Sequence, residues 1–84
     1  MDDDEKLIRG EQAKRALSDP LIKEALGQIE RDAVERMLAA DIKDDEARYR
    51  LVLLIQVIRE VRNYLTSVKT TAMEVAKRQG LQFD

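Results

Sequence analysis

The sequence predicts an all-α protein of three helices, in which the last two form an antiparallel hairpin and the whole chain joins an oligomeric bundle. Three observations lead to this class. Apolar residues recur every three or four positions between residues 47 and 75, no Pro or Gly interrupts that run, and two earlier segments show helical spacing. Charged residues are 38% of the chain and hydrophobic residues 44%, which is typical of amphipathic helices. A chain of 84 residues is expected to form one small domain, here residues 1–84.

The first expected helix covers about residues 5–17, after a short acidic segment that caps it or frays. Its apolar face is weak and consists of Leu7, Ile8, Ala13, Ala16 and Leu17. Gly10 and Ala13 lie roughly in line, and such small residues let a helix approach its neighbour closely. Gly10 also lowers the helix propensity by about 1 kcal/mol relative to Ala.

The second expected helix covers about residues 20–40. Pro20 ends the helix before it and fits the first turn of a new one, with Ser18 or Asp19 as the N-cap. The apolar stripe of this helix is Ile22, Leu26, Ile29, Ala33, Met37 and Ala40. This stripe has further apolar residues on both flanks, so we expect the helix to touch two others. We expect Gly27 to mark a close packing contact.

The third expected helix covers about residues 45–79 and organises the rest of the chain. Asp44, Asp45 and Glu46 come just before its apolar run, where carboxylates suit a helix N-terminus, and Gly80 is a plausible C′ residue. The short polar turn at residues 41–45 makes the second and third helices antiparallel neighbours. Its seam, with a mean repeat of about 3.5 residues as in coiled coils, is Ala47, Leu51, Leu54, Ile58, Val61, Leu65, Val68, Ala72 and Val75.

Residues 51–58 are apolar on nearly every side of the third helix, so one chain has too few helices to cover them. The sequence therefore predicts a homo-oligomer, with another protein as an alternative partner. The expected interface residues are Leu51, Val52, Leu53, Leu54, Ile55, Val57, Ile58, Val61, Leu65 and Val68. At the chain end, Phe83 is expected to fold back onto the last turn, with contact to a partner as the alternative.

The charge is divided unequally along the chain. Residues 1–46 carry 8 Lys and Arg against 14 Asp and Glu, whereas residues 47–84 carry 7 against 3. The acidic half is therefore expected to pack along the basic helix. Nucleic-acid binding is an alternative that we do not favour, because no motif of a known reader accompanies the basic residues. The candidate contacts for it are Arg59, Arg62, Lys69, Lys77 and Arg78.

Catalysis is not expected. The chain has no Cys and no His, which leaves only carboxylates, and we expect neither a cofactor nor a metal. Asp32 and Glu35 have the spacing with which some helical pyrophosphatases hold magnesium, but the third helix offers only Glu60 and Glu74 to face them. No membrane span is expected, because the longest apolar run is residues 51–55, and we expect a cytoplasmic protein.

The order of features resembles that of small helical proteins of tailed bacteriophages, from the head-assembly and DNA-packaging gene region. The resemblance rests on residues 16–26 (ALSDPLIKEAL) and 44–48 (DDEAR), which opens the long apolar helix, and it spans about residues 10–70. It implies a structural or morphogenesis component, located in the host cytoplasm or the virion. Small terminase-like DNA-packaging adaptors are the implied alternative. An inhibitor of a host protein is a third hypothesis, compatible with the acidic N-terminal half.

Overall fold

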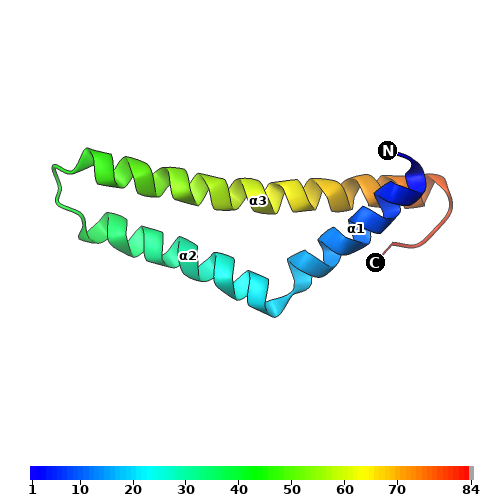
Figure 1. Cartoon of the computed structure of the whole chain (residues 1–84), viewed down its shortest axis with the longest axis horizontal. Helices are drawn as coiled ribbons and strands as arrows, with labels where there is room; N and C mark the ends of the chain where they lie inside the picture. Colours follow the sequence, from blue (N-terminus) through cyan, green and yellow to red (C-terminus); the bar gives the residue numbers. More distant parts are fainter. Residues whose placement is uncertain (84) are drawn as a thin grey trace.

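The computed structural model describes residues 1–83 and contains three α-helices: α1 (Asp3–Ser18), α2 (Pro20–Ala39) and α3 (Asp45–Arg78). α2 and α3 are antiparallel neighbours joined by a short turn, and α1 lies along the C-terminal half of α3 (Figure 1). The predicted all-α class and the hairpin are confirmed. Each helix end lies within two residues of its predicted position.

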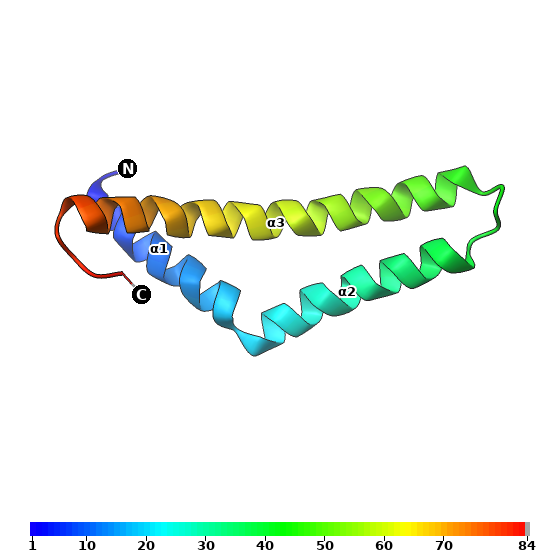
Figure 2. The same ribbon diagram turned by 180° about the vertical axis from the view of Figure 1, so that it is seen from behind.

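The chain is an elongated rod. It extends 56 × 23 × 15 Å, and its radius of gyration is 17.4 Å, whereas a compact chain of this length would have about 12 Å. α1 and α2 form a V whose apex points away from α3, and α3 runs past both arms (Figures 1 and 2). Any cross-section of the rod therefore contains α3 and essentially one other helix.

Aspartates start all three helices. Asp2 accepts a hydrogen bond from the Glu5 N–H at 2.8 Å, so the acidic segment forms the first turn of α1. Asp19 accepts from the N–H groups of Leu21 (2.8 Å) and Ile22 (3.1 Å), which makes it the N-cap of α2. Asp44 does the same for α3. These side chains satisfy backbone donors that have no partner inside the helix.

Gly80 ends α3 as predicted. Its φ of +70° is a left-handed conformation that glycine adopts without strain. The Leu81 N–H donates to the Ala76 carbonyl at 2.8 Å, and the Gly80 N–H donates to the Lys77 carbonyl at 3.2 Å. These two bonds form a Schellman motif, which turns the chain back toward α1.

The best-buried part of the chain lies between α1 and the C-terminal half of α3. It is built from small side chains on both helices: Gly10, Ala13, Ala72, Val75 and Ala76. The predicted close approach of α1 to a neighbour is confirmed at Gly10 and Ala13. Phe83 folds back as predicted, and Lys14 Nζ lies 5.9 Å from the centroid of its ring.

The contact between α2 and α3 is thinner than the sequence suggests. Ala33 and Ile58 are buried there, but Ile22 and Ile29 remain on the surface. α2 touches both α3 and α1, as predicted, and its contact with α1 is the smaller of the two. The prediction for Gly27 is wrong. A Cβ at Gly27 would meet only the guanidinium of Arg31, on the same helix, at 3.3 Å.

Candidate interaction surface

Four exposed apolar side chains form a continuous stripe on α3. Leu54, Val57, Val61 and Tyr64 recur at intervals of three, four and three residues, so they lie on one side of the helix. Their exposed fractions range from 37% for Leu54 to 61% for Tyr64. We call these four residues the α3 stripe. Large apolar side chains aligned on a surface are typical of a site that another protein covers.

The α3 stripe is open because α2 packs against a neighbouring side of α3. The sequence predicts that Leu54 and Val61 lie in the packed seam. In the structure the residue after each of them, Ile55 and Arg62, is half-buried, and Ile58 is buried between them along the helix. Because Ile58 stays inward, α3 is turned from the predicted seam by less than the roughly 100° that separates successive residues, which is enough to leave Leu54 and Val61 on the surface.

Glu30 accounts for this rotation. It lies in the inward stripe of α2, where the more buried residues are Leu26, Glu30, Ala33 and Met37. Its carboxylate oxygens lie 3.0 Å from Arg62 Nη1 and 3.5 Å from Arg59 Nε. Turning α3 so that Val61 faced α2 would place this carboxylate against hydrocarbon without a partner, which is unfavourable.

The ion pair also fixes the charge of Glu30. The hydrogen bond from Arg62 is the largest influence, and the positive charges of Arg62 and Arg59 act in the same direction, so the pKa of Glu30 is lowered despite partial burial. Glu30 is therefore ionised at neutral pH and is held in a fixed interaction. A carboxylate in this state is poorly suited to act as a general acid or base near pH 7.

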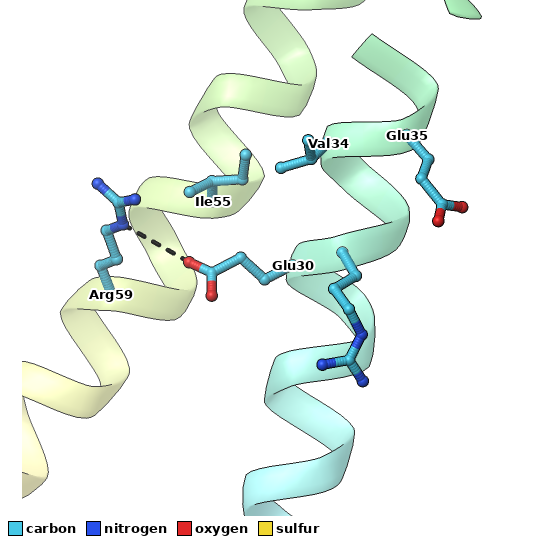
Figure 3. Close-up of a pocket in the computed structure, with 6 residues that line it drawn as sticks. Glu30, Val34, Glu35, Ile55 and Arg59 are labelled. Carbon is cyan, nitrogen blue, oxygen red and sulfur yellow. Dashed lines mark ion pairs between the residues drawn. The ribbon is translucent and has the colours of Figure 1, made fainter. Parts of the chain in front are cut away.

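A shallow hollow lies beside this ion pair. Figure 3 shows Val34 of α2 and Ile55 of α3 directed toward one another, the Glu30 carboxylate directed toward Arg59, and Glu35 pointing away. The hollow has a volume of about 440 Å³, and its lining is Glu30, Arg31, Val34, Glu35, Ile55 and Arg59. Two carboxylates and two guanidinium groups balance one another there, so the hollow has no preference for a charged ligand of either sign.

The hollow and the α3 stripe lie on opposite faces of the hairpin. Val34 follows the buried Ala33, Arg59 follows the buried Ile58, and both Val34 and Arg59 line the hollow. On both helices, the residue directly after an inward-facing residue therefore lies on the face of the hollow. The residue directly before an inward-facing residue lies on the opposite face of the hairpin. Ile29 precedes Glu30 and is 43% exposed, so it lies on the same face as Leu54 and Val61. We call Ile29 together with the α3 stripe the open face.

The predicted interface residues divide into three groups. Ile58 is buried in the chain's own core. Leu51, Ile55, Leu65 and Val68 are half-buried. The exposed residues of the predicted set are Val52, Leu53, Leu54, Val57 and Val61. About half of the predicted set is thus exposed to a partner.

The predicted nucleic-acid contacts are dispersed. Arg59 and Arg62 converge on Glu30, and Arg78 lies 3.7 Å from Asp3. Lys69 is half-buried, and Lys77 is exposed beside the folded-back Phe83. The structure therefore brings only two of the five together, and it does so around an acidic residue.

Sequence reasoning missed two members of the open face, Tyr64 and Ile29. Tyr64 follows Val61 by three residues, so continuation of the spacing from Leu54 could have identified it. The apolar spacing predicts that Ile29 lies in the packed stripe of α2, although Leu26, Glu30, Ala33 and Met37 have the same helical spacing. An acidic residue in a stripe of apolar residues was the available signal.

Within residues 1–83, no group of three or more Asp or Glu side chains is placed to hold a metal ion. No helix in the described part of the chain is long and apolar enough to cross a membrane. No protein-family model, curated protein or solved structure matches the chain. The open face is therefore the main candidate functional feature of the described residues.

Proposed function

We propose that this protein is a non-enzymatic helical assembly protein whose working surface is the open face. The observation that carries this proposal is the α3 stripe, an unbroken row of exposed apolar side chains on the longest helix. A row of this kind is costly to leave in water and gains free energy when a second helix covers it. The resemblance of residues 16–26 and 44–48 to phage head-assembly proteins supports a role in virion morphogenesis.

The shape of the chain supports the same proposal. Stable domains bury their apolar faces between at least two layers of secondary structure. This chain extends 56 Å along its longest axis and only 15 Å along its shortest, so its three helices lie close to one plane. It thus supplies one layer, and assembly would supply the second.

The proposal is tested by the mass of the protein in solution, measured by light scattering at low and high salt. At both salt concentrations we expect a mass of two or more chains, where one chain is 9.7 kDa. The mass should not fall with salt, because contacts between apolar side chains are not screened by salt. A mass of one chain at micromolar concentration would refute self-assembly. The open face would then be a docking site for a different protein.

A pair of neighbouring substitutions shows whether the open face is responsible. Val57→Glu places a charge in the α3 stripe and is expected to give a single-chain mass. Gln56→Glu adds the same side chain at an exposed position turned away from the stripe, and is expected to keep the wild-type mass. Unchanged helix content by circular dichroism would exclude unfolding as the cause. Equal masses for both variants would contradict the proposal.

A further inference from the structure

We infer that the partner on the open face is a second copy of this chain, and that two copies pair with α3 against α3 around a two-fold axis, with both hollows facing outward. This inference rests on the proposed function. It adds which face is used, what covers it and how the assembly closes.

The number of helices in each cross-section favours a second copy. One half of the rod contains α2 and α3, and the other half contains α1 and α3. Two helices side by side cannot enclose a core, whereas four can. Pairing two rods side by side brings four helices into most cross-sections, whichever way the second rod points.

The exposed area fits one such partner. The chain exposes 6448 Å², whereas a compact folded chain of 9.7 kDa exposes about 5,100 Å². The excess is about 1,300 Å², which is more than the about 800 Å² that a standard interface buries on each partner but within the roughly 1,000–2,500 Å² per partner of obligate homodimers. One neighbour bound through an interface of that size would bury an area equal to the excess.

The difference between the two faces of the hairpin selects the open face. Pairing through the opposite face would remove water from four charged side chains, Glu30, Arg31, Glu35 and Arg59, which is unfavourable unless each gains a new partner. Pairing through the open face covers four uncharged side chains, Ile29, Leu54, Val57 and Val61. It brings in fewer charged ones, because on α2 only Asp32 and Arg36 both precede an inward residue and carry a charge. Glu46 and Arg50, joined at 2.6 Å, lie at the end of the α3 stripe as part of a polar rim.

The use of the open face by both copies also determines how the assembly closes. When the same surface is used by both partners, the contact is symmetric and the assembly ends at two copies. An open filament would require a second, different contact surface on each chain. We therefore expect a closed dimer.

Disulfide cross-linking tests this arrangement without interference, because the chain has no native cysteine. Single-cysteine variants are made at the four positions of the α3 stripe: Leu54→Cys, Val57→Cys, Val61→Cys and Tyr64→Cys. The matched control is Val34→Cys, an exposed valine on the face of the hollow. Each variant is first required to keep the wild-type mass and helix content under reducing conditions.

After oxidation, non-reducing electrophoresis should show a doubled mass for at least one stripe variant and a mass of 9.7 kDa for Val34→Cys. A disulfide forms only when two Cβ atoms approach within about 4.5 Å, so only the positions near the two-fold axis should react. Cross-linking of Val34→Cys with none at the stripe would overturn the inference and leave the proposed assembly function intact. A wild-type mass above two chains would also overturn it, whereas a single-chain mass would refute both proposals.

Discussion

Gly10 of α1 lies directly against Ala72 of α3. A Cβ atom built on Gly10 would be 2.0 Å from the Ala72 Cβ and 3.2 Å from the ring of Phe83. Two carbon atoms that are not bonded to each other cannot be that close, so the separation of α1 from α3 requires glycine at this position. Phe83, in the segment that folds back after α3, lies against α1 at the same position.

We predict that Gly10→Ala destabilises the protein by about 2 kcal/mol, because the helices must separate to admit the methyl group. This loss exceeds the gain of about 1 kcal/mol in helix propensity. Gly27→Ala is the matched control, since its added methyl group would meet only the flexible Arg31 side chain. We expect that variant to be as stable as the wild type or more stable. Urea unfolding measures both, and equal effects of the two substitutions would contradict the prediction.

Ile58 and Val57 are neighbours in sequence with opposite environments. Ile58 is 4% exposed and lies in the chain's own core, whereas Val57 is 55% exposed in the α3 stripe. We predict that Ile58→Ala lowers the free energy of unfolding by about 2–4 kcal/mol at every protein concentration. Val57→Ala should instead reduce the dependence of the melting temperature on protein concentration, because it weakens association. A loss of intrinsic stability from Val57→Ala as large as that from Ile58→Ala would show that the α3 stripe is core.

The ion pair of Glu30 should make stability depend on pH. The pKa of Glu30 is lowered in the folded chain by Arg62 and then by Arg59, so folding favours the ionised carboxylate. Its contribution is complete above the unfolded value of about 4.3 and is lost as the pH falls through the lower folded value. Glu30→Gln should therefore be less stable than the wild type at pH 7, and the difference should disappear in acid. A difference that persisted below the folded pKa would point to packing instead of charge.

Asp19 connects α1 to α2 and caps α2 with two hydrogen bonds. We predict that Asp19→Ala lowers the stability by about 1 kcal/mol, because the first backbone N–H groups of α2 lose their acceptor. Asp19→Asn keeps an acceptor oxygen and should remain close to the wild type. Amide hydrogen exchange at Leu21 and Ile22 would localise the effect, and unchanged exchange there in Asp19→Ala would contradict it.

Features of the fold that depend on local chemistry were predictable from the sequence. Asp19 and Pro20 set the start of α2, Gly80 sets the end of α3, and the small residues Gly10 and Ala13 indicate the close contact of α1. Each of these signals acts within one or two turns of helix. They fixed the class, the number of helices and their ends.

The side of α3 that packs against α2 was not predictable from apolar spacing alone. The predicted seam places Val61 inward, but the pairing of Glu30 with Arg62 turns the helix by a fraction of one residue's rotation. This choice depends on a contact between residues 32 positions apart, which no local pattern contains. The same rotation created the open face, so the candidate site was predicted in its general location and not in its exact membership.

The elongated shape affects how the chain will behave on a sizing column. A radius of gyration of 17.4 Å is that of a compact protein of about 230 residues, although the chain has 84. A single chain will therefore elute earlier than a globular protein of the same mass. Elution position alone would give a false oligomer, whereas a dimer paired side by side would gain mass with little gain in length.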